Sequence, residues 1–122
     1  DRPTVERGVA ALLADPRHGR YFVACDGPRV VGQMMHTYEW SDWRNGQIWW
    51  LQSVYVAADF RQRGVFRALF EHVLHAAEAD PGVVGVRLYV EDENKSAQAA
   101  YAKLGLDEAG YHVMERMFAP RR

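Results

Sequence analysis

Hydrophobic and polar positions repeat with two periods along the chain. Apolar residues at helical spacing predict helices over residues 5–14, about 64–79 and about 95–104. Short apolar or alternating runs predict strands over residues 21–25, about 29–37, 47–56 and 83–90. The turn Asp26-Gly27-Pro28 joins two strands as an antiparallel hairpin, whereas the last two strands flank a helix and so require parallel pairing. We therefore expect an α/β fold with a mixed, mainly antiparallel sheet opened around one parallel strand pair.

The strand over residues 47–56 carries apolar side chains on both alternating faces. One face holds Ile48, Trp50, Val54 and Val56, and the other holds Trp49, Leu51 and Tyr55. A strand that is apolar on both sides is typical of the covered centre of a sheet. We expect this strand to be central.

The element boundaries come from local signals. Thr4 is the candidate cap of the first helix, and Asp15-Pro16 ends it. Asn45-Gly46 predicts a turn in a loop that carries Trp40 and Trp43. Residues 106–118 predict a final strand, either one long strand or a hairpin bent at Gly110.

Composition limits the classes of function. The 122 residues predict one domain, and 48% hydrophobic with 25% charged residues is ordinary for a soluble protein. No run reaches the roughly 18 apolar residues of a membrane span. A net charge of −1 gives no overall basic field for nucleic acid. Because Cys25 is the single cysteine, no internal disulfide can form, and we expect a reducing, cytoplasmic compartment.

A cationic loop stands between the central strand and the second helix. Arg61, Arg63 and Arg67 surround Gly64 where the helix begins. The unpaired N–H groups and the dipole of a helix N-terminus both favour negative charge. This combination predicts an anion site, with phosphate as the first candidate. The alternative is a solvated cationic turn, which has the same composition.

A pair of polar residues lies on the predicted third helix. Asn94 is placed to cap it, and Tyr101 follows seven residues later, nearly two turns along the same face. Ligands of open α/β sheets bind outside the carboxyl ends of parallel strands. A long, thin ligand could reach both residues while its phosphates rest on the arginine loop.

These motifs resemble those of the GNAT superfamily of N-acetyltransferases, and the resemblance covers most of the chain. The family's first signature appears as Arg61-Gln62-Arg63-Gly64-Val65-Phe66, after the strand end Val54-Tyr55-Val56. The second appears as Leu88-Tyr89-Val90 followed by Asn94, Ala97, Tyr101, Lys103, Leu104 and Gly105. The two signatures occur in the family's order and spacing.

The resemblance implies acetyl-CoA as co-substrate, a small-molecule or peptide amine as acceptor, and no metal. Backbone groups at the strand end would pair with pantetheine, loop N–H groups would hold the pyrophosphate, and Asn94 would bond to the pantetheine arm. Tyr101 would protonate the departing CoA sulfur. The implied cofactor-binding residues are Val54, Tyr55, Val56, Arg61, Gln62, Arg63, Gly64, Val65, Phe66, Arg67, Asn94 and Tyr101.

The chain departs from the family pattern in three ways. Phe66 replaces a small residue, so its ring either stands near the pyrophosphate turn or points into the core. Gln52 stands where many members carry a glutamate base, and an amide cannot take that proton. The family's first strand and helix are mostly absent, so we expect residues 1–122 to form one acetyltransferase domain without them.

The general base is therefore open. Glu39, on the tryptophan loop, is the first candidate, because a loop carboxylate could also attract a cationic amine. The others are Asp42 on that loop, His36 and His112 on flanking strands, and a water chain to a backbone carbonyl.

Two other functions remain open. One is a non-catalytic CoA-binding module of the same fold. The other is a small nucleic-acid-binding domain using the arginine loop, against which the net charge argues. Trp40 and Trp43 are suited either to an acceptor wall or to a homodimer surface. We expect no nucleic-acid or membrane partner.

Overall fold

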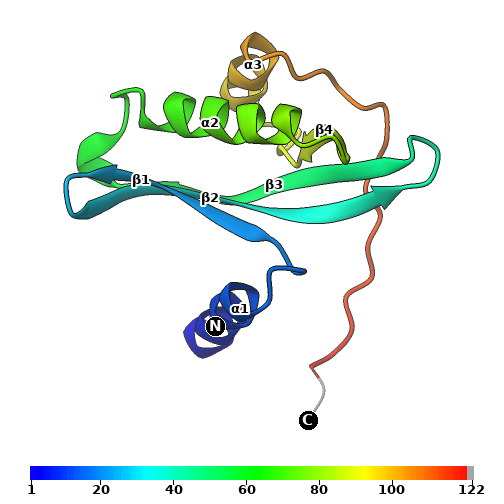
Figure 1. Ribbon diagram of the computed structural model, residues 1–122, viewed down its shortest axis with the longest axis horizontal. Coiled ribbons are helices and arrows are strands. Elements are labelled where there is room, and N and C mark those ends of the chain that lie inside the picture. The colour runs from blue at the N-terminus through cyan, green and yellow to red at the C-terminus, as the bar shows by residue number, and fades with distance from the viewer. Residues whose placement is uncertain (121–122) are drawn as a thin grey trace. The chain divides into compact units, whose positions relative to one another are not determined.

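The computed structural model describes residues 1–120, which form two compact units, Asp1–Tyr89 and the chain from Val90 onward. The first unit contains α1 (Arg2–Ala14), β1 (Arg20–Asp26), β2 (Arg29–Ser41), β3 (Gly46–Val56), η1 (Ala58–Phe60), α2 (Val65–Ala79) and β4 (Val83–Leu88). Its strands lie in the order β1-β2-β3-β4 (Figure 1). Every neighbouring pair is antiparallel except β3–β4, which is parallel. The predicted fold class and the central place of β3 are confirmed.

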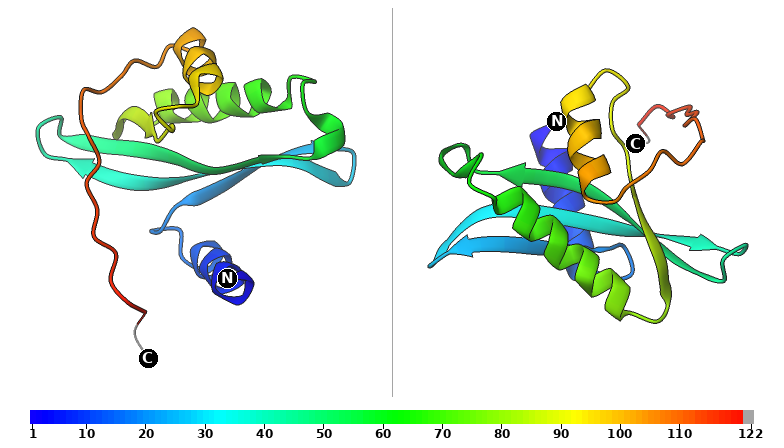
Figure 2. Two further views of the ribbon diagram at one scale, coloured as in Figure 1. Left: turned by 180° about the vertical axis from the view of Figure 1, so that it is seen from behind. Right: turned by 90° about the horizontal axis from the view of Figure 1, so that it is seen from above.

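The main core lies between α2 and one face of the sheet. Helix α2 crosses the strands (Figure 2, right) and buries its apolar stripe against them. The buried residues of this stripe are Leu69, Phe70, Val73 and Ala77. On the strands, Met34, Trp49 and Leu51 are also buried. The predicted helix is confirmed, and Arg67, Glu71 and Glu78 are exposed on its opposite side.

Helix α1 lies on the other side of the sheet from α2 (Figure 1) and begins earlier than predicted. Asp1 caps it by accepting a hydrogen bond from the Thr4 N–H at 3.3 Å, so the prediction of Thr4 as the cap was wrong. Pro3 in the first turn needs no partner for a backbone N–H, which lets the helix start before Thr4.

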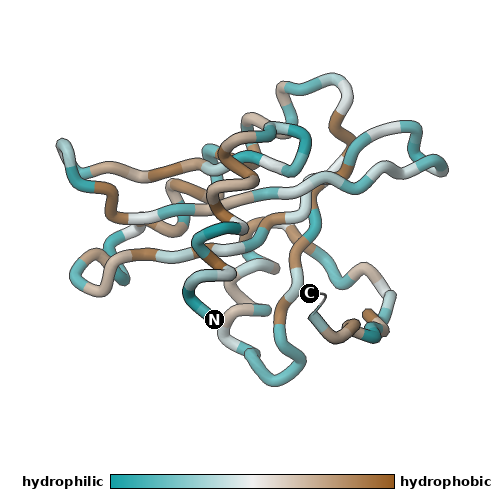
Figure 3. Tube along the Cα trace, turned by 90° about the horizontal axis from the view of Figure 1, so that it is seen from below, coloured by the Kyte–Doolittle hydropathy of each residue, from teal (hydrophilic) through white to brown (hydrophobic). Residues whose placement is uncertain are grey.

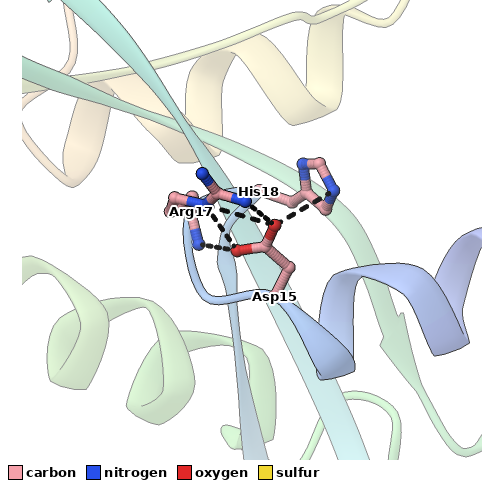
Figure 4. Close-up of polar contacts among 3 residues, drawn as sticks. All are labelled: Asp15, Arg17 and His18. Carbon is pink, nitrogen blue, oxygen red and sulfur yellow. Dashed lines mark hydrogen bonds and ion pairs between the residues drawn. The ribbon is translucent and has the colours of Figure 1, made fainter.

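The predicted stop at Asp15-Pro16 is confirmed, and an ion pair organises the turn that follows it. Asp15 caps the C-terminus of α1, and its carboxylate accepts from Arg17 Nη2 at 2.8 Å (Figure 4). His18 Nε2 lies 3.8 Å from the same carboxylate. The Arg17 guanidinium holds the pKa of Asp15 below its usual value.

The β2–β3 hairpin is longer than the sequence predicts. Strand β2 continues to Ser41, and Glu39 pairs with Ile48 across the ladder. Placing Glu39 and Trp40 on a loop was therefore wrong, because cross-strand pairing extends the two strands to the turn. The turn itself is confirmed, with Asn45 at φ 50° just before Gly46.

A β-bulge interrupts β3 and changes which side chains share a face. Tyr55 pairs with Gln33 and Gln52 with Met35, so Ser53 and Val54 together oppose the single residue Met34. The extra residue moves Tyr55 to the face of Trp50, and Val56 to the face of Trp49 and Leu51. Strict alternation predicted the opposite faces for both. Ser53 accommodates the bulge with φ 53°.

The second unit contains α3 (Lys95–Lys103). Asn94 caps it by accepting from the Ala97 N–H at 3.1 Å, as predicted. Gly105, with φ 93°, ends it. The Leu106 N–H donates to the Tyr101 carbonyl at 3.1 Å and the Gly105 N–H to the Ala102 carbonyl at 3.1 Å, which is a Schellman motif.

The predicted strand at residues 106–118 does not form in the described part of the chain. Gly110 has φ 79° and bends the chain, as expected. The apolar side chains beyond it are exposed, for example Met114 at 93%.

No helix within residues 1–120 is long and apolar enough to cross a membrane. Polar and apolar residues are interspersed along the chain (Figure 3).

Candidate functional site

The parallel strands separate at their carboxyl ends. Pairing between β3 and β4 ends at Leu51 and Leu88, whereas β3 continues to Val56 while still paired with β2. Along residues 52–56, the β3 edge that faced β4 has no strand partner in the described chain. Backbone N–H and C=O groups at such an edge can pair with an extended ligand as they would with another strand.

The arginine loop follows directly and ends in a helix N-terminus. After η1, Gln62 and Gly64 take left-handed backbone conformations, with φ 61° and 80°, and α2 begins at Val65. Gly64 is the cap residue and supplies no side-chain hydrogen bond to the first turn. The positive end of the α2 dipole therefore lies at this loop, as an anion site requires.

The three arginine side chains contact the protein itself. Arg61 Nε donates to the Val56 carbonyl at 3.0 Å, and Arg63 Nη1 donates to the Asp59 carbonyl at 3.4 Å. Arg67 Nε bonds Glu71 at 2.9 Å, one turn along α2. These guanidinium groups hold the loop and helix in place while adding positive charge beside the helix N-terminus.

Of the two orientations expected for the Phe66 ring, the structure has the one that points into the core. Its ring is half-buried, with its centroid 6.0 Å from that of Phe70, which is fully buried in the core. The Phe66 side chain thus packs toward the α2 core.

Glu39 lies in a polar cluster on the face of the sheet opposite α2. Its Oε1 accepts from Trp50 Nε1 at 2.7 Å, and its Oε2 from Arg87 Nη1 at 3.0 Å. Gln52 is on the same face and donates to Thr37 Oγ1 at 2.7 Å. Trp50 and Arg87 were not predicted as partners of Glu39. These partners follow from the register of β2, β3 and β4, which is known only once the full length of the β2–β3 hairpin is known.

The other candidate bases occupy different environments. Asp42 is exposed in the hairpin turn, where it accepts from the Trp43 N–H at 2.8 Å. His36 is fully buried and stacks on Trp49 with ring centroids 3.8 Å apart. Its burial lowers the pKa to about 4, so the imidazole is neutral at pH 7. His112 is exposed in a segment that is not a strand, so the prediction of a strand for His112 was wrong.

Asn94 and Tyr101 belong to α3, as predicted, and lie at its two ends. Capping uses the Asn94 side-chain oxygen, which also accepts from Ser96 Oγ at 3.2 Å, so the amide nitrogen is not needed for the cap. Tyr101 is half-buried, and burial raises the pKa of its phenol. The phenol is therefore protonated at neutral pH.

Within residues 1–120, no group of three or more His, Cys, Asp and Glu side chains is arranged to hold a metal ion.

The sequence model of the acetyltransferase (GNAT) family matches residues 2–106. A similar solved structure is that of a possible acetyltransferase from Clostridium difficile 630. It is 44% identical, covers 98% of this chain and 79% of its own, and superposes with a TM-score of 0.92. None of the curated proteins matches the sequence.

Two more distant structures share the fold. A putative acetyltransferase from Agrobacterium tumefaciens C58 is 20% identical over 89% of this chain and 76% of its own, with a TM-score of 0.74. Glucosamine-6-phosphate N-acetyltransferase from Arabidopsis thaliana is 17% identical over 93% of this chain and 76% of its own, with a TM-score of 0.72. Acetyl-CoA is the co-substrate typical of the matched family. The chain belongs to the GNAT family of acetyltransferases.

Proposed function

We propose that this protein transfers an acetyl group from acetyl-CoA to a primary amine by direct attack within a ternary complex. The observation that carries the proposal is the separation of β3 from β4 after Leu51 and Leu88, immediately before the arginine loop and the N-terminus of α2. One unit thus presents an open strand edge beside an anion site. CoA has the matching parts, an extended amide-containing arm and a pyrophosphate.

In this proposal the pantetheine arm pairs with the open edge of β3 through backbone groups of Val54 and Val56, on either side of Tyr55. The pyrophosphate is held by N–H groups of the loop and first turn. The loop and first turn comprise Arg61, Gln62, Arg63, Gly64, Val65, Phe66 and Arg67. Asn94 donates its side-chain N–H to the pantetheine arm.

The chemical step forms one bond and breaks one. The neutral amine attacks the thioester carbonyl, and N–H groups near Val54–Val56 stabilise the oxyanion of the tetrahedral intermediate. The intermediate collapses with cleavage of the C–S bond, and the Tyr101 phenol gives its proton to the departing thiolate. The nitrogen of the intermediate, which is positively charged after attack, gives up one proton to solvent, and the Tyr101 phenolate regains a proton from solvent. The raised pKa of Tyr101 is consistent with this role, because the phenol is protonated when substrate binds. The products are an N-acetyl amide and CoA.

The attacking amine must first lose a proton, and we propose Glu39 as the group that takes it, directly or through water. Glu39 shares a sheet face with Gln52. Gln52 is the nearest equivalent, by the resemblance, of the glutamate base that many family members carry. Each oxygen of Glu39 already accepts one hydrogen bond, from Trp50 or Arg87, and a carboxylate oxygen can accept a second. A water chain to a backbone carbonyl remains the alternative.

Acceptor-dependent release of CoA thiol tests the proposal. Cys25 is an exposed free thiol that would react with the same reagent, so the assay is run in a Cys25→Ser background. We expect thiol release with acetyl-CoA and some members of a panel of primary amines. We expect Tyr101→Phe to lower kcat about 10²-fold or more while leaving acetyl-CoA affinity within about twofold.

Wild-type turnover in Tyr101→Phe would remove Tyr101 from the acid role. Lys103→Ala on the same helix is the matched control, because Lys103 is exposed and has no part in the proposed mechanism.

One observation favours a second function, a CoA-binding module without catalysis. Gln52 cannot act as a base, and Glu39 is already engaged with two donors. Tight acetyl-CoA binding without acceptor-dependent thiol release at any pH would identify such a module.

A further inference from the structure

We propose that Arg29 is a positioning residue that holds residues 58–64, here the pyrophosphate loop, in the conformation that binds the CoA pyrophosphate. The inference rests on the proposed function and adds a residue that neither family signature contains. Arg29 opens β2, and its partner Asp59 lies in η1, at the start of the pyrophosphate loop. The contact therefore joins the start of β2 to the pyrophosphate loop.

The contact is a two-point ion pair. Arg29 Nη1 donates to Asp59 Oδ2 at 2.7 Å, and Nη2 donates to Oδ1 at 2.8 Å. The two side chains are 53% and 60% exposed, so the pair adds little to the stability of the whole protein. A bidentate guanidinium–carboxylate pair nevertheless fixes direction as well as distance. Its effect should fall on the local geometry of the loop.

Phe60, the residue after Asp59, makes a second set of contacts with arginines. The Arg29 guanidinium lies 5.3 Å from the Phe60 ring centroid, and the Arg63 guanidinium lies 4.3 Å from it. Arg63 also donates to the Asp59 carbonyl at 3.4 Å. Both the side chain and the backbone of Asp59 are therefore held by arginines, and Phe60 packs against the same two groups.

The pyrophosphate loop needs such support because of its backbone. Gln62 has φ 61°, which is unfavourable for a residue with a Cβ atom. Strained backbone persists only where surrounding contacts hold it. A site made of backbone N–H groups binds an anion well only when those groups point to one place, so loosening the turn should weaken binding without removing any ligand contact.

A simpler explanation is that Arg29 only adds positive charge near the phosphates. The two explanations make opposite predictions for Asp59. Removing its negative charge strengthens the attraction for an anion if charge alone matters. The same change weakens binding if the Arg29–Asp59 pair positions the loop.

The experiment is a calorimetric titration of acetyl-CoA into the full chain and its variants. We expect Asp59→Asn to weaken binding roughly three- to tenfold, on the scale of a lost charge-assisted hydrogen bond. We expect KM for acetyl-CoA to rise by the same factor while kcat at saturation stays within about twofold. The matched control is Asp15→Asn. Asp15 pairs with Arg17 at the end of α1 (Figure 4) and has no part in the loop, so this variant should leave the affinity for acetyl-CoA unchanged.

Arg29→Lys provides a second, independent variant, because it keeps the charge and loses the two-point geometry. Weaker binding in this variant supports the positioning role. Unchanged or tighter binding in Asp59→Asn, or unchanged binding in Arg29→Lys, would overturn it while leaving the proposed function intact. Failure of the wild type to bind acetyl-CoA would instead overturn the proposed function and this inference together.

Discussion

His36 shows how a single residue couples stability to pH. It is fully buried against Trp49, its Nε2 has no hydrogen-bond partner in residues 1–120, and its pKa is lowered to about 4. Burial is the main cause, and the nearby positive charge of Arg20 acts in the same direction. Since an exposed histidine has a pKa near 6.5, the unfolded chain binds a proton more readily than the folded one between these two values.

We therefore expect His36 to lower the free energy of unfolding as pH falls from about 6.5 toward 4. At pH 5 the expected loss relative to pH 7 is about 2 kcal/mol from this residue. Urea unfolding at both pH values measures it in the wild type and in His36→Phe, which cannot titrate. His75→Gln, an exposed histidine on α2, is the control and should keep the full pH dependence. Equal pH dependence in His36→Phe and the wild type would contradict the assignment.

At the scale of elements, Gly46 shows why β3 and β4 can approach closely. It stands at the first position of β3, and a Cβ atom there would overlap Cγ1 of Val84 on β4. Gly85, the next residue of β4, has open space where its Cβ would stand. Adding a methyl group should therefore destabilise the fold more at Gly46 than at Gly85.

We expect Gly46→Ala to lower the free energy of unfolding by about 1–3 kcal/mol, the usual cost of overpacking. Gly85→Ala is the control and should change it by less than about 1 kcal/mol, since its methyl group meets no atom. The double variant Gly46→Ala, Val84→Ala should recover part of the loss. Chemical denaturation of all three variants provides the measurement. Equal stability of Gly46→Ala and Gly85→Ala would contradict the close packing.

The elements that the sequence predicted well have strong local signals. The helical spacing of α2 and the Asn94 cap each follow from the chemistry of a few neighbouring residues. The bulge at Ser53 and Val54 does not, because it depends on how β3 registers against β2. The bulge also puts Tyr55 on the side of Trp50 and Val56 on the side of Trp49, so both side chains whose faces were mispredicted lie within the candidate site.

At the scale of the whole molecule, the segment at residues 106–118 shows the limit of pattern alone. Its apolar residues predict a strand, but a strand must pair with the edge of another strand. Residues 106–118 form no strand in the described part of the chain. In contrast, the arginine loop was located from sequence because its signals are local. The contacts of Arg61 and Arg63 with their own loop were not predictable, since both side chains donate to backbone carbonyls whose positions depend on the folded loop.

The central claim is that the open edge of β3 and the arginine loop together bind acetyl-CoA. Calorimetric titration of acetyl-CoA into the wild-type protein tests it most directly. We expect one site per chain, with Kd between about 1 μM and 1 mM, the usual range of KM for enzyme substrates. We also expect weaker binding at higher salt, because the pyrophosphate is held partly by charge. No binding at acetyl-CoA concentrations up to several millimolar, with the protein folded, would contradict the account.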